Sequence, residues 1–207
     1  GIVGFNRPVT LAVAEAMRQI FYEVIVAPSY EADALALLRK KRDLRLLEVS
    51  RSEESSEVQV RRVSGGMLIQ TPDQIEEDSS GWDIPSKRDP NVLEWSDLQF
   101  AWRAVKHIKS NAIVLVKDKS IVGMGAGQPN RVTSVHLALR AAGEKAENSV
   151  LASDAFFPFP DGVALAASGG VKAVIQPGGS IRDSEIIEIA DQRDLAMIFT
   201  GTRHFQH

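Results

Sequence analysis

An arginine that follows a glycine-rich run is the first candidate for ligand chemistry. Arg131 comes after Gly123, Gly125 and Gly127, and this run separates an expected strand from an expected helix. A guanidinium can bind phosphate or carboxylate through two parallel hydrogen bonds, and a helix amino terminus favours an anion. The spacing is not that of a Rossmann or Walker loop. A tight turn that needs positive φ explains the glycines at least as well, and Asn130 could cap the helix.

Residues 153–161 form a second candidate segment, rich in aromatic residues and prolines, directly after an expected strand. Ligand clefts tend to open where strands end. The aromatic rings could stack on a flat heterocycle, although we expect Phe157 to lie in the core. Asp154 and Asp161 could each accept a hydrogen bond from a ligand, but Asp161 fits equally well as the N-cap of the next helix.

Three further segments carry polar groups that have both a functional and a plain structural interpretation. Residues 175–180 could form an anion-binding nest or a plain glycine turn. Residues 200–207 place basic and aromatic side chains close behind an apolar strand, where a frayed tail is the usual alternative. Lys106 and His107 suggest a general base, but adjacent helical residues point in different directions, which favours a surface pair. Asn111 follows the same helix and could be a C-cap or a polar group at a cleft.

Composition narrows the classes of function. The 207 residues carry a formal net charge of −3 and no cysteine. A general nucleic-acid binder would normally have a clear excess of Lys and Arg, and the absence of cysteine excludes disulfides, thiolate zinc sites and cysteine nucleophiles. We find no apolar run of membrane-spanning length and no signal-like start. We therefore expect an intracellular protein that binds neither nucleic acid nor membranes; its short apolar start suggests a piece of a longer chain.

The elements that must position these residues follow from apolar periodicity. Helical spacing alternates with short apolar runs, which predicts an α/β fold whose sheet is at least partly parallel and covered by helices on both faces. Residues 73–91 are polar and proline-rich, as in a long connection. The expected helices are 11–21, 31–41, 95–109, 130–146, 161–168 and 183–191. The expected strands are 24–27, 44–49, 58–63, 67–70, 112–116, 121–124, 150–152, 171–175 and 195–199, with a polar turn over 51–57.

Several long motifs, in one order, resemble the carboxyl-terminal part of the AICAR transformylase/IMP cyclohydrolase family. They are residues 109–114, 123–128 with Arg131, 153–159, 176–183 and 200–207. The likeness extends upstream through 23–28 and 64–70, so it covers essentially the whole chain. The resemblance implies layered α/β/α, cytidine-deaminase-like subdomains. Residues 1–72 would be the remainder of a first formyltransferase subdomain, 73–95 a connection and 96–207 a second subdomain.

The family's reaction, as the resemblance implies, transfers a formyl group from 10-formyltetrahydrofolate to the amine of AICAR in purine biosynthesis. The resemblance also implies a cytoplasmic homodimer with active sites across the dimer, and it permits a monovalent cation such as potassium. It implies no metal site of the deaminase kind. By matching position, Asn111 would act at the reacting groups as the catalytic residue. The residues that would bind substrate are Glu23, Arg131, Phe156, Asp161, Arg203 and Phe205.

Two parts of the family pattern have no counterpart in these 207 residues. One is the amino-terminal IMP cyclohydrolase domain. The other is a lysine–histidine pair in a Lys-His-x-Asn-Pro-Cys-Gly-like motif, which performs proton transfer in the family; Lys106 and His107 lack the rest of that motif. The chain is therefore expected to carry part of a formyltransferase site. The alternative is a non-catalytic module for substrate binding and dimerisation. A zinc deaminase is a poor alternative, because the required His and Cys signature does not occur.

Overall fold

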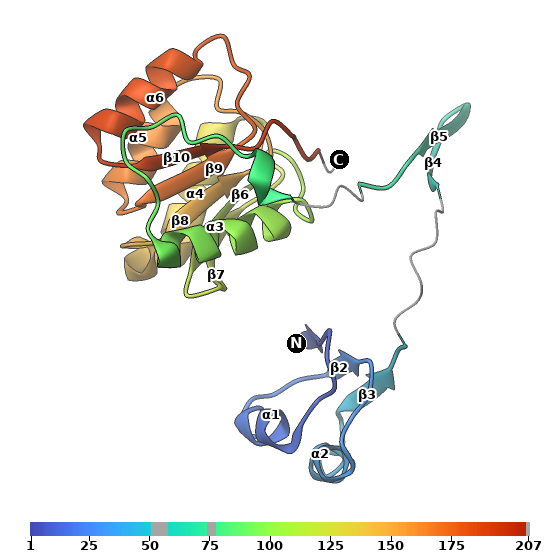
Figure 1. Ribbon diagram of the computed structural model, residues 1–207. Helices are drawn as coiled ribbons and strands as arrows, with labels where there is room; N and C mark the ends of the chain where they lie inside the picture. Colours follow the sequence, from blue (N-terminus) through green and yellow to red (C-terminus); the bar gives the residue numbers. More distant parts are fainter. Residues whose placement is uncertain (51–57, 74–77, 206–207) are drawn as a thin grey trace. The chain divides into compact units, whose positions relative to one another are not determined.

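The computed structural model describes residues 1–50, 58–73 and 78–205, so the turn expected at 51–57 lies outside the described part (Figure 1). The chain divides into two compact units, Gly1–Pro72 and Asp73–His207. Their assignment to two formyltransferase subdomains stays a prediction. Within the described ranges, no helix is both long and apolar enough to cross a membrane.

The first unit contains a small parallel sheet in the order β1-β2-β3 with two short helices. Its elements are β1 (Ile2–Gly4), α1 (Leu11–Ala16), β2 (Val24–Ala27), α2 (Ala32–Leu38) and β3 (Arg45–Glu48). Ile25 and Ala27 of β2 are fully buried and pack with Ala14 of α1 and with Ala34 and Leu38 of α2. The alternation of helix and strand that the sequence predicts here is confirmed.

Helix α1 ends five residues before the expected end at Phe21. Ile20 and Phe21 are 52% and 72% exposed, so the apolar spacing does not continue as a buried face. The ammonium of Lys41 donates to the carbonyl oxygens of Met17 at 3.2 Å and Ile20 at 2.6 Å. These bonds give a charged donor to two carbonyl groups of the turn that follows α1.

A two-stranded antiparallel hairpin, β4 (Gln59–Val63) and β5 (Gly66–Gln70), completes the first unit. Every residue of both strands is exposed, including the large apolar side chains of Val60, Met67 and Ile69. A lone hairpin is marginally stable in water. The exposed apolar surface therefore needs a partner of some kind.

The second unit is built on a five-stranded sheet in the order β10-β9-β8-β6-β7. Strands β8, β9 and β10 run parallel to one another, whereas β6 is antiparallel to both β7 and β8. The strands are β6 (Ile113–Lys117), β7 (Ser120–Gly125), β8 (Val150–Ser153), β9 (Ala173–Gln176) and β10 (Ala196–Phe199). The helices are α3 (Val92–Val105), α4 (Arg131–Ala142), α5 (Asp161–Ser168) and α6 (Asp183–Gln192), with 3-10 turns η1 (Ser79–Gly81) and η2 (Gly143–Ala146).

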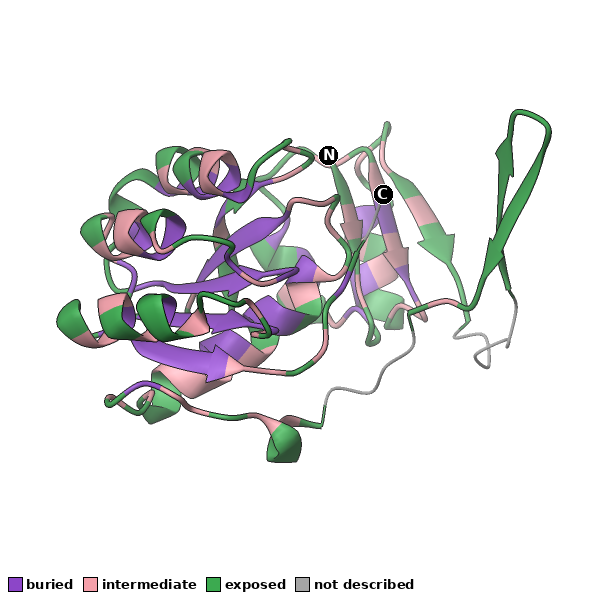
Figure 2. Cartoon of the chain, turned by 90° about the horizontal axis from the view of Figure 1, so that it is seen from above, coloured by how far each residue is buried: buried purple, intermediate pink, exposed green. Residues whose placement is uncertain are grey.

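Successive residues of this sheet enter two different cores. Ile113 and Leu115 of β6 pack with α4, α5 and α6, whereas Val114 and Val116 pack with α3 on the other face. Strands β8, β9 and β10 alternate in the same way, as the two-residue repeat of a strand requires. Figure 2 shows these strands buried between exposed helix faces. The predicted α/β class, with helices on both faces of a partly parallel sheet, is confirmed.

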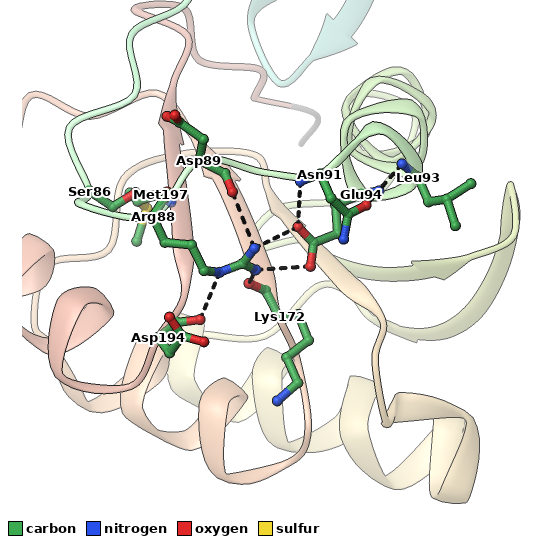
Figure 3. A network of polar contacts seen from close by, with 9 residues as sticks. All are labelled: Ser86, Arg88, Asp89, Asn91, Leu93, Glu94, Lys172, Asp194 and Met197. Carbon is green, nitrogen blue, oxygen red and sulfur yellow. Dashed lines mark hydrogen bonds and ion pairs between the residues drawn. The ribbon is translucent and has the colours of Figure 1, made fainter.

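The segment expected to be a plain connection packs onto the second unit. Trp82 and Ile84 lie against the core on the α3 side of the sheet. Arg88 donates to both carboxylate oxygens of Glu94 at 2.9 Å and to the carbonyls of Lys172 at 2.5 Å and Asp194 at 2.9 Å (Figure 3). These bonds fasten the segment to the start of α3 and to the chain before β9 and β10.

Candidate active site

The glycines of the run 123–127 serve two different purposes. A Cβ on Gly125 would lie 2.0 Å from the carbonyl oxygen of Ser134, and one on Gly123 would lie 2.2 Å from that of Ala138. These two glycines therefore allow β7 to lie directly against α4. Only Gly127 has positive φ, +66°, and its N–H donates to the carbonyl of Lys109 at 2.9 Å. The N–H of Gly127 is therefore not free to bind an anion.

The start of α4 places Arg131 inside the protein. Asn130 is the N-cap, as expected, and its side chain accepts from the N–H of Thr133 at 2.9 Å. Arg131 is then the first helical residue and is only 6% exposed. One guanidinium nitrogen, Nη1, forms an ion pair with Asp154 and donates to Ser153 Oγ at 2.8 Å. Arg131, which was expected to bind a ligand anion, is thus already paired with a carboxylate of its own chain.

Asp154 differs most from its expected place. The sequence suggested an acceptor that faces a ligand, but the structure buries Asp154 completely at the end of β8. Its carboxylate accepts from Arg131 and from the hydroxyl of Ser110. A buried charge needs such a partner. Asp154 is therefore the counterion of Arg131.

Asn111 is held on both sides of its amide. Its Oδ1 accepts from Nη2 of Arg131 at 2.9 Å, and its Nδ2 donates to the carbonyl of Gln128 at 2.9 Å. Ser134 Oγ also donates to the backbone carbonyl of Asn111 at 2.7 Å. An amide nitrogen has two N–H groups, so one remains for a ligand. Donation from a guanidinium to Oδ1 polarises the amide and makes that remaining N–H a stronger donor.

The aromatic segment after β8 divides into buried and accessible rings. Phe157 is 1% exposed and belongs to the core, as expected; its N–H donates to the side-chain oxygen of buried Gln176 at 2.8 Å. Phe156 is half-buried, and Phe159 is exposed. Asp161 is exposed and is the first residue of α5, after Pro160 at the N-cap position. The alternative that Asp161 is the N-cap is wrong.

The carboxyl-terminal segment is not a frayed tail over the residues that are described. His204 is 1% exposed, and its N–H donates to the carbonyl of Asp154 at 2.9 Å. Arg203 and Phe205 on either side are exposed, and the guanidinium carbon of Arg203 lies 5.1 Å from the centre of the Phe205 ring. These residues are therefore joined through the backbone to the strand end that carries Asp154.

The structure brings most of the expected site residues into the second unit. Asn111 and Arg131 are hydrogen-bonded to each other. Arg203 and Phe205 flank His204, whose N–H donates to the backbone carbonyl of Asp154. Glu23 lies in the first unit, where its exposed carboxylate accepts from the Gly1 amino group at 3.1 Å.

His107 is exposed and Lys106 is half-buried just after α3, which agrees with a surface position. The glycine turn at 178–179 uses the N–H of Gly179 for the Asp183 carboxylate at 2.7 Å, which favours a plain turn. Over the described ranges, no group of three or more His, Asp or Glu side chains is placed to hold a metal ion.

Sequence reasoning missed Gln128, Ser134 and His204 as parts of this site. Gln128 contributes only its backbone carbonyl, which no side-chain pattern can reveal. Ser134 follows Arg131 by one helical turn, a spacing that places both on one face. His204 stood in the suspected tail motif, but nothing in its type indicated burial.

The chain is similar to several known proteins. The family model described as AICARFT/IMPCHase bienzyme matches residues 1–141. The bifunctional purine biosynthesis proteins PurH of Bacillus thuringiensis (strain Al Hakam) and Bacillus cereus (strain AH820) are each 51% identical over 208 aligned residues. These alignments cover 100% of this chain and 41% of each relative, so the chain spans less than half the length of the relatives.

Among solved structures, RibD of Acinetobacter baumannii is similar with a TM-score of 0.35 and 19% identity, over 52% of this chain and 34% of that chain. The family match covers more than half of the chain, and the identity to the Bacillus proteins extends over all of it. The chain belongs to the AICARFT/IMPCHase bienzyme family.

Proposed function

We propose that this chain forms part of an AICAR formyltransferase, which transfers a formyl group from 10-formyltetrahydrofolate to AICAR to give FAICAR and tetrahydrofolate. The family membership supports the reaction, and the held amide of Asn111 is the observation that carries it. The parent protein would also be an IMP cyclohydrolase, in a domain beyond these residues.

Asn111 is the proposed catalytic residue. The AICAR amine attacks the formyl carbon, and the carbonyl oxygen gains negative charge as the new C–N bond forms. The free N–H of Asn111 Nδ2 donates to that oxyanion, in an orientation that Arg131 and the Gln128 carbonyl fix beforehand. The bond from carbon to the folate nitrogen then breaks as that nitrogen takes a proton. We assign the proton transfers to the family's lysine–histidine pair, outside this chain.

The remaining residues are assigned to binding. Arg203 is exposed and can contact an anionic nucleotide, while Phe205 and half-buried Phe156 offer apolar rings for the base. Asp161, exposed at the start of α5, is assigned to the folate. Arg131 acts through Asn111, since its guanidinium is bound to Asp154, and direct contact with the nucleotide stays a prediction. Glu23, in the first unit, is assigned to substrate binding on the family resemblance alone.

The wider setting is proposed from the family alone. The protein would act in the cytoplasm as a homodimer whose sites need residues of both copies, and a monovalent cation such as potassium would bind near the site. The exposed apolar hairpin β4–β5 supports an assembly with a second copy, since it needs cover.

The test is an AICAR formylation assay of the chain, alone and with a fragment that supplies the remaining part of the Bacillus cereus relative. We expect activity only with the fragment, and Asn111→Ala should then lower kcat about 100-fold to 1000-fold, as loss of an oxyanion donor does. Gln192→Ala, at the far end of α6, is the control and should leave kcat unchanged.

Each other outcome refutes a part of this proposal. Enzyme-like turnover by the chain alone would show that the proton-transfer pair is not elsewhere, and His107 would then be the first residue to test. Binding of AICAR with no formylation in any combination would instead favour the non-catalytic binding and dimerisation module.

A further inference from the structure

His204 is a buried polar side chain between two exposed ones. Its Nδ1 lies 2.5 Å from Oδ2 of Asp73, and its ring centre lies 4.7 Å from that of Trp102 on α3. Its own N–H is bound to the Asp154 carbonyl at 2.9 Å. The side chain and the backbone of this one residue therefore join the carboxyl-terminal segment to the start of the second unit, to α3 and to the end of β8.

The residues on either side of His204 share the opposite side of the segment. Arg203 and Phe205 are exposed, and the guanidinium of Arg203 lies 5.1 Å from the Phe205 ring centre. The His204 ring is buried while both of its neighbours are exposed. A contact that fixes the His204 ring therefore also constrains the backbone from which the side chains of Arg203 and Phe205 project.

Packing alone does not explain a histidine at this position. Its Nε2 is buried and has no hydrogen-bond partner among the described residues, which costs stability. A leucine would fill similar space against Trp102 without that cost. What only the histidine supplies is the bond from Nδ1 to Asp73, which fixes the position of the segment along its length.

We propose that His204, held by Asp73 and Trp102, is a positioning residue that sets Arg203 and Phe205 for the substrate nucleotide. This inference rests on the proposed function, because the ligand of Arg203 and Phe205 is taken to be AICAR. His204 itself touches no substrate. Its effect should therefore appear in the binding of AICAR and should depend on Arg203.

Steady-state kinetics of the complemented enzyme test the positioning role. His204→Leu should raise the KM for AICAR about tenfold, roughly the loss of one charge-assisted contact, while kcat and the KM for 10-formyltetrahydrofolate stay within about twofold. His204→Asn places an N–H near the former Nδ1 and should restore most of the AICAR affinity. In an Arg203→Ala background, His204→Leu should add little.

Limited trypsin digestion tests the anchor without any reference to activity. Cleavage after Arg203, measured as loss of residues 204–207 by intact mass, should be faster in His204→Leu and Asp73→Asn than in wild type. An unchanged rate in both variants would show that His204 is no anchor. Faster cleavage with an unchanged KM for AICAR would refute the positioning role. So would a rise in that KM on His204→Leu that is as large in the Arg203→Ala background as in the wild-type background.

The two proposals can fail separately. A complemented wild-type protein that neither binds nor formylates AICAR would refute the proposed function and with it the ligand named here. The trypsin rates would still decide whether His204 holds the segment.

Discussion

Arg131 and Asp154 form the buried ion pair on which the candidate site depends. The exposed fractions of their side chains are 5% and 0%. Removing one partner of such a pair leaves a charge in a poorly solvated place, and this costs more than the pair itself contributes. The pair therefore constrains which substitutions the site tolerates.

Arg131→Met should lower the free energy of unfolding by about 3–5 kcal/mol, because Asp154 loses its counterion. Adding Asp154→Asn removes the unpaired charge and keeps an acceptor for Ser110, so the double variant should recover a part of the loss. Urea unfolding of both variants at neutral pH is the measurement. A double variant less stable than Arg131→Met would contradict the assignment of the loss to an unpaired carboxylate.

The sequence could predict single residues of this site but not the contact between Arg131 and Asp154. Asn130 as a cap and Arg131 as a cation at the start of the helix follow from a local pattern of glycines before a helix. The partner of Arg131 is decided by sheet order, which sets the end of β8 beside the start of α4. No spacing along the chain reveals that contact. Asp154 was consequently expected at a ligand.

At the scale of elements, β7 and α4 lie so close together that no side chain fits at Gly123 or Gly125 between them. Gly125→Ala would bring a Cβ to 2.0 Å from a backbone oxygen of α4, and backbone cannot rotate away. The helix must shift, and it carries Arg131 and Ser134, which hold Asn111. Gly125→Ala should lower the melting temperature and the formylation rate together. Gly81→Ala, where nothing lies within 4 Å, is the control and should change neither.

The clamp between Arg88 and Glu94 should make stability depend on pH. Burial alone would raise the pKa of Glu94, but hydrogen bonds from Arg88 and the Asn91 N–H, with the charges of Arg88 and Lys172, lower it overall. A carboxylate whose pKa is lowered by folding stabilises the protein above its unfolded pKa, and this contribution is lost as the pH falls through the folded value.

Glu94→Gln should therefore reduce the free energy of unfolding by about 1–3 kcal/mol at pH 7. The difference from wild type should shrink as the pH falls below roughly 4, where unfolded glutamate becomes protonated. Urea unfolding of wild type and variant, at pH 7 and at a pH below roughly 4, measures this difference in the free energy of unfolding. Glu185→Gln breaks an exposed pair with Arg182 and should change stability by less than about 0.5 kcal/mol. A difference for Glu94→Gln that is equal at both pH values would rule out the charge as its cause.

At the scale of the whole molecule, the predicted homodimer is tested at the hairpin β4–β5. Met67 is 65% exposed and Ile69 is 64% exposed, and both lie on one side of β5. If a second copy covers this surface, Met67→Asp should shift the sedimentation of the complemented enzyme from dimer to monomer. Gln192→Asp, at the exposed end of α6, makes the same change of charge and is the control. A dimer that persists in Met67→Asp would place the interface elsewhere.

Much of the fold was predictable because each element carries its own period. Helix α5 begins and ends at the expected residues, and β2 matches as well. Two of the errors lie at helix ends. Helix α1 stops at Ala16, before a turn whose carbonyls accept from the distant Lys41. The capping box of Asn91 and Glu94, a local signal that the apolar period does not contain, starts α3 three residues before the expected Trp95. The antiparallel direction of β6 against β8 depends on which strands pair, and the apolar pattern of one strand contains no such information.

The outer strand of the larger sheet is closed by the chain's own earlier segment. Met197 of β10 donates its N–H to Ser86 Oγ at 2.8 Å, and Phe199 exchanges both backbone bonds with Asp83 at 2.9 Å. Unpaired outer strands recruit other chains and cause aggregation. Residues 83–88 thus occupy the backbone groups of β10 that could otherwise pair with a strand of another chain. A shortened second unit that begins at α3 would leave the edge of β10 unpaired. Any soluble minimal version must therefore begin before Asp83.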